Sequence, residues 1–247
     1  MKYKEYSQEI WNQIHEAIDK VFEKDDAPVA AFDADGTLWD TDLGETFFHY
    51  QIDNKLVSLP KDPWNHYQEM KQRNPQEAYL WLAQICKGQT LETVHNWAKS
   101  SLKAHHPVPV FSEQQKLIEL LLSRGVKIYI ITASVKWAVE PGTSFYGLSY
   151  DNVIGVETEV VNGVVSDKQK GFISYKEGKV EALLARTGGK APFLASGNTM
   201  GDFQLLQSAT HLGLAVSAAS RDDKLFKTER ELSENAQLHG WASHRFV

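Results

Sequence analysis

Two aspartates, Asp33 and Asp35, stand one residue apart directly after the apolar run "APVAAF" at positions 27–32. Carboxylates repel each other and are costly to gather where water is scarce. A divalent cation removes that repulsion, and Mg²⁺ prefers oxygen ligands. An ionised aspartate can attack phosphorus, and a second carboxylate can serve first as general acid and then as general base. The pair therefore predicts metal-assisted phosphoryl chemistry at the end of a buried strand.

Further polar residues follow two other apolar runs of the chain. Thr132 ends "VKIYIIT" (126–132), and the loop "SGNTMGD" (196–202) follows "PFLA". Ligands of open parallel sheets collect outside the carboxyl ends of the strands, so we expect these segments to meet the two aspartates at one edge. Phosphoryl oxygens bound there would need positive partners. We expect these to be one lysine and hydroxyl or backbone N–H groups at Thr132, Ala34, Asp35 and Ala133.

The order of apolar runs predicts the sheet that positions these residues. Strand-like runs at 27–32, 126–132, 192–196 and 211–216 alternate with helix-like segments at 111–125, 176–187 and 202–209. This alternation predicts an α/β fold, with a Rossmann-like parallel sheet flanked by helices. Ser112 and Gln115 predict a capping box for the helix at 111–125, which Gly125 should end. "VVNGVV" (160–165) predicts a hairpin with a two-residue turn.

Residues 42–108 interrupt the alternation. They look helical, as in "NPQEAYLWLAQICKG" (74–88), and hold several tryptophans that we expect to pack within the insert. We therefore predict a helical cap domain at 42–108, inserted after the first core strand. Residues 1–41 and 109–247 would together form the α/β core domain.

Composition narrows the classes of function. The chain has 247 residues and a net charge of −6 without a Lys/Arg cluster, which argues against nucleic-acid or anionic-membrane partners. Cys86 is the only cysteine, so an internal disulfide is excluded. The first 24 residues read as an amphipathic helix rather than a signal peptide, and no run of residues is long and apolar enough to span a membrane. We expect a cytoplasmic protein, while its oligomeric state cannot be read from the sequence.

Four motifs in order resemble those of the haloacid dehalogenase superfamily of phosphatases. They are "DADGT", the apolar strand that ends in Thr132, Lys179 in "EGKVEALL", and "GNTMGD". The segment "IITAS", the "VVNGVV" hairpin and the helical insert resemble the phosphoserine phosphatase-like branch. The resemblance implies a Mg²⁺-dependent phosphomonoesterase that acts on a small phosphorylated metabolite through an aspartyl-phosphate.

The resemblance also implies roles for single residues. Asp33 would be the nucleophile and a Mg²⁺ ligand, and Asp35 the general acid/base with its backbone carbonyl on the metal. Thr132, Ala133 and Lys179 would bind phosphate, with Lys176 as the alternative lysine.

The fourth motif departs from the family in one residue. Asn198 and Asp202 fall where the family has two aspartates, and both would ligate Mg²⁺. An amide oxygen can do so, but Asn198 removes one negative charge and should weaken metal binding.

The insert should choose the substrate. In phosphoserine phosphatase-like enzymes a cap-side acid holds the amino group of the substrate and an arginine holds its carboxylate. The resemblance therefore implies phosphoserine as the substrate here, with Asp42, and Glu45 close by, as the acid and Arg73 as the arginine. An alternative is phosphocholine, its quaternary ammonium bound by these acids and by aromatic rings. The rings would be Trp39, Trp64 and Trp81. Transfer to an acceptor alcohol, or a phosphate-binding domain without catalysis, are further alternatives.

Overall fold

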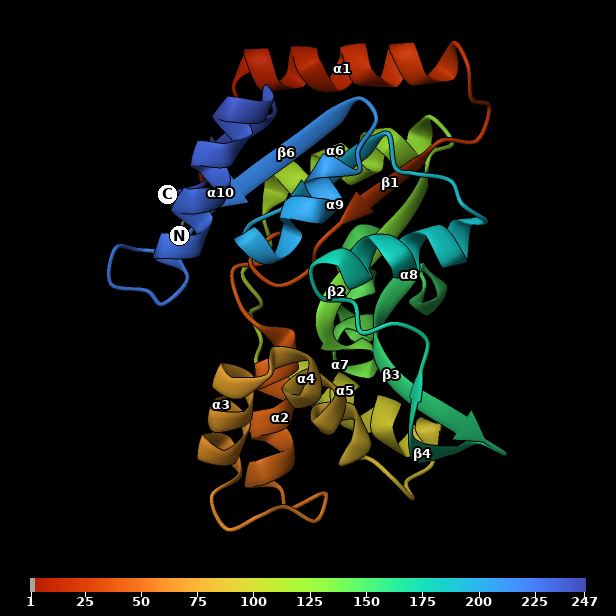
Figure 1. Cartoon of the computed structure of the whole chain (residues 1–247), viewed down its shortest axis with the longest axis vertical. Coiled ribbons are helices and arrows are strands. Elements are labelled where there is room, and N and C mark those ends of the chain that lie inside the picture. Colours follow the sequence, from red (N-terminus) through yellow and green to blue (C-terminus); the bar gives the residue numbers. More distant parts are fainter. Residues whose placement is uncertain (1–2) are drawn as a thin grey trace.

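The computed structural model describes residues 3–247 and places a seven-stranded sheet among them (Figure 1). The strand order is β4-β3-β2-β1-β5-β6-β7, and every neighbouring pair is parallel except β3 with β4. This confirms the predicted α/β fold. The strands are β1 (Val29–Phe32), β2 (Lys127–Val135), β3 (Val153–Val161), β4 (Val164–Lys170), β5 (Leu194–Gly197), β6 (Leu212–Ser217) and β7 (Ala242–Arg245).

Helices cover both faces of the sheet. On one face, α1 (Gln8–Phe22) and α6 (Ser112–Ser123) bury their apolar stripes against Phe32, Ile130 and Leu214. On the other face lie α8 (Glu177–Thr187), α9 (Phe203–Gln207) and α10 (Phe226–His239). Burial on both faces explains why the central strands are almost entirely apolar.

Helix α6 starts differently from the prediction. Phe111 occupies the N-cap position and no side chain caps the helix, so the predicted capping box of Ser112 and Gln115 is wrong. The physical reason is tertiary: Gln115 donates instead to the carbonyl of Phe145 at 3.0 Å. The C-terminal prediction is confirmed, because the chain leaves the helix at Gly125 with a φ of +81°.

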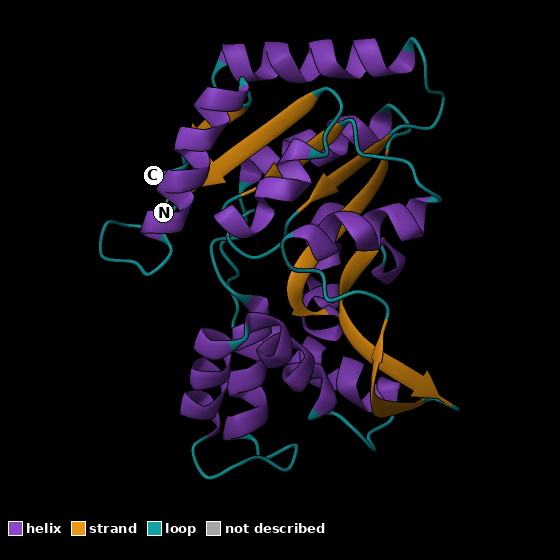
Figure 2. Cartoon of the chain, in the orientation of Figure 1, coloured by secondary structure: helices purple, strands orange, loops and turns teal. Residues whose placement is uncertain are grey.

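The segment between β1 and α6 holds four helices, seen in the lower half of Figure 2. They are α2 (Leu43–Asp53), α3 (Pro63–Arg73), α4 (Pro75–Gln84) and α5 (Leu91–Ala104). Each begins after a residue whose side chain accepts a backbone N–H three residues further on. These four caps are Asp42, Asp62, Asn74 and Thr90.

A second hydrophobic cluster holds these helices together, and it extends beyond the insert. Val135, Trp137, Val156 and Val165, from β2, the short helix α7 (Lys136–Val139), β3 and β4, pack within it. The β3–β4 hairpin, whose two-residue turn has positive φ at Asn162 and Gly163 as predicted, therefore supports the cap. The predicted cap boundary at 42–108 stays a prediction. The packing indicates in addition that the β3–β4 hairpin, which lies outside this range, contacts the helices of the cap.

None of the helices within residues 3–247 is both long and apolar enough to cross a membrane.

Candidate active site

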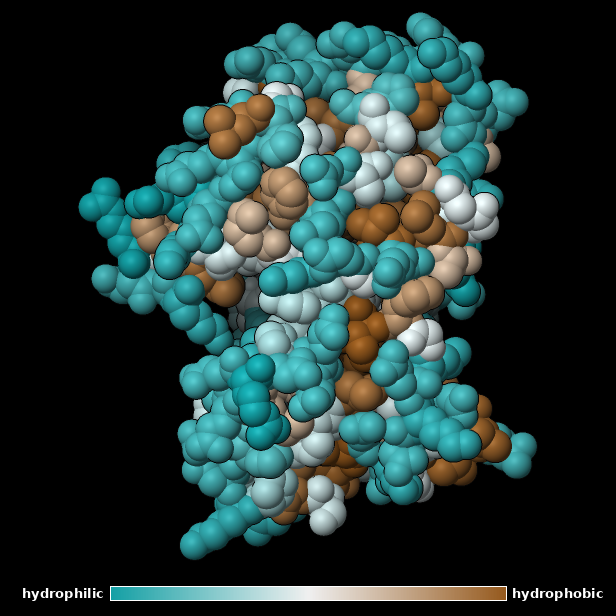
Figure 3. Space-filling model, viewed as in Figure 1, coloured by the Kyte–Doolittle hydropathy of each residue, from teal (hydrophilic) through white to brown (hydrophobic). Residues whose placement is uncertain are grey.

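A cavity of about 450 Å³ lies where the carboxyl ends of β1, β2 and β5 face α2, α3 and α4. Figure 3 shows the surface drawn in at this level, between the sheet above and the helices below. Nine of the predicted site residues line this cavity, whereas Arg73 does not. They are Asp33, Asp35, Asp42, Glu45, Thr132, Ala133, Lys179, Asn198 and Asp202.

Asp33 follows β1 directly and is held by donors on both carboxylate oxygens. Lys179 Nζ donates to Oδ1 at 2.5 Å, and the Thr37 hydroxyl donates to Oδ2 at 3.0 Å. Burial, together with the nearby Asp202, raises the pKa of Asp33 to about 6, and Lys179 opposes this rise. Lys179 and Thr37 thus fix the orientation of the Asp33 carboxylate, and Lys179 favours its ionised form.

Lys179 lies buried between two carboxylates. Its Nζ is 2.5 Å from Asp33 Oδ1 and 2.5 Å from Asp202 Oδ1. Burial alone would lower the pKa of Lys179, but Asp202 and Asp33 raise it above its ordinary value, so the ammonium stays charged. Lys176, the alternative lysine, does not line the cavity, and its ammonium lies over the ring of Tyr175.

Asp35 accepts three hydrogen bonds. Its Oδ1 accepts from Trp39 Nε1 and from the Leu43 N–H, both at 2.8 Å, and its Oδ2 accepts from the Ser134 hydroxyl at 2.7 Å. Burial raises the pKa of Asp35 to about 6, and these donors limit the rise. A carboxyl group with a pKa near neutrality can both give and take a proton, which suits a general acid/base.

Strand β2 passes Thr132 rather than ending there. It continues to Val135, with a shift in its pairing with β3 between Ile131 and Val135. Thr132 is 1% exposed, and its hydroxyl accepts the N–H of Ser134 at 3.0 Å. Irregular pairing is typical of strands that turn side chains and backbone groups toward a site.

The loop after β5 is braced by Asp202. Oδ1 of Asp202 accepts from Lys179, and Oδ2 accepts the backbone N–H groups of Asn198 and Thr199 at 3.2 and 3.0 Å. Both oxygens are therefore engaged. Asp202 thus supports the loop and Lys179, and its predicted role as a metal ligand stays a prediction.

Asn198 is the better placed of the two predicted ligands on this loop. Its Oδ1 lies 3.4 Å from the Thr37 hydroxyl, which is also 3.0 Å from Asp33 Oδ2, so the two oxygens converge. A carboxylate and an amide oxygen are hard ligands that fit Mg²⁺. Within residues 3–247 no group of three or more His, Cys, Asp and Glu side chains is placed to hold a metal, and the predicted site includes an amide, which is not one of these side chains.

Two acids at the start of α2 line the opposite side of the cavity. Asp42 caps α2, with Oδ1 accepting the Glu45 N–H at 2.7 Å. Burial, with the nearby carboxylates of Asp35 and Glu45, raises the pKa of Asp42 to about 8. Within residues 3–247 no cation is paired with the Asp42 carboxylate. A cationic ligand bound beside Asp42 would favour the ionised form of this carboxyl group, so the cavity suits such a ligand.

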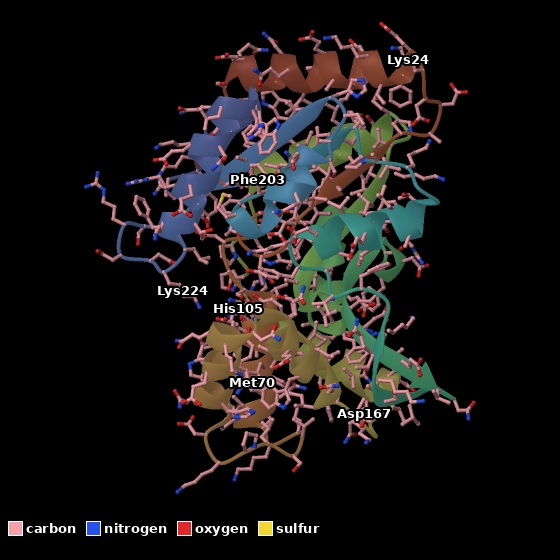
Figure 4. The ribbon with its side chains drawn as sticks, viewed as in Figure 1. Lys24, Met70, His105, Asp167, Phe203 and Lys224 are labelled. Carbon is pink, nitrogen blue, oxygen red and sulfur yellow. The ribbon has the colours of Figure 1, made fainter. Side chains whose placement is uncertain are left out.

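Glu45 carries two ammonium partners from different parts of the chain. Lys71 of α3 lies at 2.9 Å and Lys224, in the loop before α10, at 3.1 Å. Figure 4 shows Lys224 on that loop, beside the helices of the insert. Although burial opposes it, the two lysines keep the pKa of Glu45 below its usual range.

Arg73 lies outside the cavity. Its side chain is 75% exposed, and its guanidinium is 3.9 Å from Glu77 on the following helix. The prediction that Arg73 holds a substrate carboxylate is not supported by this geometry. The cation of α3 that does reach the cavity is Lys71, and no sequence signal distinguished it.

The aromatic rings at the cavity are tyrosines rather than the predicted tryptophans. Lys71 Nζ lies 5.3 Å from the ring centre of Tyr67 and 5.6 Å from that of Tyr79. Trp39 is fully buried, and its N–H donates to Asp35. Trp64 and Trp81 pack in the second hydrophobic cluster.

The fold and the site together define a class of protein. The family model of the haloacid dehalogenase-like hydrolases matches residues 30–207, and the chain belongs to this family. The match includes Asp33, Asp35, Thr132, Lys179, Asn198 and Asp202, and it confirms the resemblance read from the motifs.

Among curated proteins, phosphorylcholine phosphatase of Pseudomonas aeruginosa is 24% identical over 192 residues. The alignment covers 62% of this chain and 55% of that relative, so the chain spans about half the length of the relative.

Two solved structures illustrate the shared fold. A protein of unknown function from Bordetella pertussis Tohama I superposes with a TM-score of 0.72 at 18% identity, covering 88% of this chain and 98% of that one. A phospho-aspartyl intermediate analogue of phosphoserine phosphatase gives 0.51 at 16% identity, covering 77% and 86%. At these identities the likeness concerns the fold alone.

Proposed function

We propose that this protein is a Mg²⁺-dependent phosphatase of a small phosphomonoester that carries an ammonium group. One observation carries the proposal. Asp33, fixed between Lys179 and Thr37, and Asp35, with a pKa of about 6, share a cavity with the unpaired carboxylate of Asp42. A phosphate bound at the strand ends would leave the far end of a small substrate beside Asp42.

The proposed reaction has two halves. In the first, a carboxylate oxygen of Asp33 attacks phosphorus, the bond from phosphorus to the substrate oxygen breaks, and Asp35 gives its proton to that oxygen. In the second, Asp35 takes a proton from water as the water oxygen attacks phosphorus, which releases phosphate and frees Asp33. Lys179, Thr132 and the N–H of Ala133 bind the phosphoryl oxygens throughout.

The donor set of Asp33 and Asn198 supports a bound Mg²⁺, with the backbone carbonyl of Asp35 as a third ligand. When bound, the ion would supply positive charge that offsets the phosphate and the gathered carboxylates. Lys179 offers a second positive charge at the same place, since it touches Asp33 directly.

The substrate proposal rests on Asp42. The ammonium group of phosphoserine would bind Asp42. Because Arg73 lies outside the cavity, the carboxylate of phosphoserine would bind Lys71 or Lys224. Phosphocholine is the second candidate. It is favoured by the rings of Tyr67 and Tyr79 and by the relative named phosphorylcholine phosphatase, although Lys71 lies over both rings.

A substrate panel tests the proposal. Purified protein with Mg²⁺ is assayed for phosphate release from phosphoserine, phosphoethanolamine, phosphocholine and the neutral aryl ester p-nitrophenyl phosphate. We expect at least one ammonium-bearing ester to exceed the aryl ester in kcat/KM by tenfold or more, the size of one charge-assisted hydrogen bond of about 1.5 kcal/mol. Repeating the assay with added alcohols separates hydrolysis from transfer. Equal efficiency on all four esters would refute the ammonium proposal but not the phosphatase.

A further inference from the structure

Asn198 poses a problem of orientation. A carboxylate accepts through both oxygens, whereas an amide has one accepting oxygen and one donating NH₂ group. Asn198 can therefore ligate a cation in only one of two orientations, which differ by half a turn of the amide. Some neighbour has to select between them.

Contacts on both sides of the Asn198 amide make that selection. Nδ2 lies 3.2 Å from Oε1 of Glu229, while Oδ1 lies on the side of the Thr37 hydroxyl and Asp33. The amide also packs closely on the loop after β1: a Cβ on Gly36 would come within 2.1 Å of Nδ2. The amide therefore has little room to move.

Glu229 is itself fixed in place. It lies on α10, is 3% exposed, and its Oε2 accepts the backbone N–H groups of Ala218 and Ala219 at 3.0 and 2.9 Å. These two donors leave Oε1 directed at Asn198. A carboxylate oxygen can only accept, so only the NH₂ group of Asn198 can face it.

We propose that Glu229 is a positioning residue, which holds Asn198 with Oδ1 turned toward Asp33 so that the amide can serve as a Mg²⁺ ligand. This inference rests on the metal role of Asn198 proposed above. It also explains the asparagine: an aspartate at position 198 would place a second buried carboxylate beside Glu229, and the two would repel. Asn198 and Glu229 thus form a matched pair.

A double-mutant cycle tests the pairing. The variants are Glu229→Gln, Asn198→Asp and the double variant, with Glu234→Gln as the control from the exposed side of the same helix. Two readouts need no substrate: Mg²⁺ affinity by calorimetry, and the melting temperature in EDTA. The melting temperature in EDTA does not depend on metal binding.

Glu229→Gln should keep its oxygen on the N–H groups of Ala218 and Ala219 and turn its NH₂ group toward Asn198. The Asn198 amide then reverses, and Mg²⁺ affinity should fall about tenfold to hundredfold, as for other groups that orient metal ligands. Asn198→Asp alone should melt at a lower temperature in EDTA. The double variant should recover both properties, because an amide NH₂ then faces a carboxylate. Glu234→Gln should change neither.

Two results would overturn this inference alone: wild-type affinity in Glu229→Gln, or a double variant that binds Mg²⁺ no better than Glu229→Gln. If Asn198→Asp fails to fold, the Mg²⁺ affinities of Glu229→Gln and of the double variant still test the inference. A wild-type protein that binds no Mg²⁺ would overturn the proposed metal site and this inference with it.

Discussion

Replacing Asp42 by asparagine should make the protein more stable at neutral and alkaline pH, and less efficient on ammonium-bearing esters. Asp42 has a folded-state pKa of about 8, against 3.8 for a free carboxyl group, because burial and the carboxylates of Asp35 and Glu45 disfavour its charge. Asparagine keeps the shape and caps a helix as well as aspartate does, so the bond to the Glu45 N–H is retained. The substitution thus removes mainly the charge.

The sign of the effect follows from proton linkage. Below pH 3.8 the Asp42 carboxyl is protonated in both the folded and the unfolded protein. As the pH rises toward 8 the unfolded chain releases this proton while the folded protein retains it, so the wild type loses stability across that window. Asparagine does not titrate. The stability advantage of Asp42→Asn should therefore be near zero at about pH 4, grow with pH, and level off above about pH 8.

The gain in the free energy of unfolding that Asp42→Asn should give can be bounded. Each pKa unit corresponds to about 1.4 kcal/mol, but the cavity exposes Asp42 to water, which screens its charge, so we expect a gain of roughly 1–3 kcal/mol at about pH 9. For a chain of this length that is roughly 2–12 °C in melting temperature. Melting curves in EDTA at about pH 5, 7 and 9 measure it, with Asp62→Asn, the cap of α3, as the matched control. A variant no more stable than wild type at the highest pH would refute the reasoning.

The remaining predictions concern the reaction and the cations of the cavity. Asp33→Asn should lower turnover of p-nitrophenyl phosphate by several orders of magnitude, because an amide does not attack phosphorus; near-wild-type turnover contradicts the covalent mechanism. EDTA should abolish turnover and Mg²⁺ restore it, while Ca²⁺, with its larger and looser shell, should inhibit. Activity that survives EDTA dialysis would remove the metal from the mechanism. Lys71→Ala should lower KM for phosphocholine about threefold to tenfold by freeing the faces of Tyr67 and Tyr79, whereas Arg73→Ala should leave KM unchanged. Equal changes in KM in Lys71→Ala and Arg73→Ala would show that Lys71 does not block access of the substrate to the two rings.

Most of the sheet could be predicted because its signals are local. The turn at Asn162-Gly163 needs positive φ at both residues, which the sequence itself expresses. Sequence patterns gave wrong predictions where a tertiary contact takes the side chain that the local motif would need. Gln115 suits a capping box, but the carbonyl of Phe145 takes its side chain. The sequence does not reveal β7 either, because "ASHR" at 242–245 is a short edge strand with too few apolar residues to read as one.

The substrate side of the site was harder to predict for a geometric reason. Helix α3 buries only Tyr67 completely, so its sequence has no apolar stripe to show which side faces the cavity. Lys71 and Arg73 are two residues apart, and side chains at that spacing point to different sides of a helix. Residue type favoured the arginine, because its planar fork suits carboxylates. The fold placed the lysine at the cavity instead.

Glu229 marks the limit of what motifs can reveal. It lies 31 residues beyond Asn198, in a helix with two other glutamates, and nothing in its spacing sets it apart. Its contact with Asn198 exists only because α10 packs on β6 and brings Glu229 over the backbone of Ala218 and Ala219. The motif supplies the amide, and a distant element decides which end of the amide faces the reaction. From the motif alone, an asparagine at position 198 looks like a loss of metal affinity. In the folded chain the same asparagine has a partner, Glu229, that the motif does not reveal.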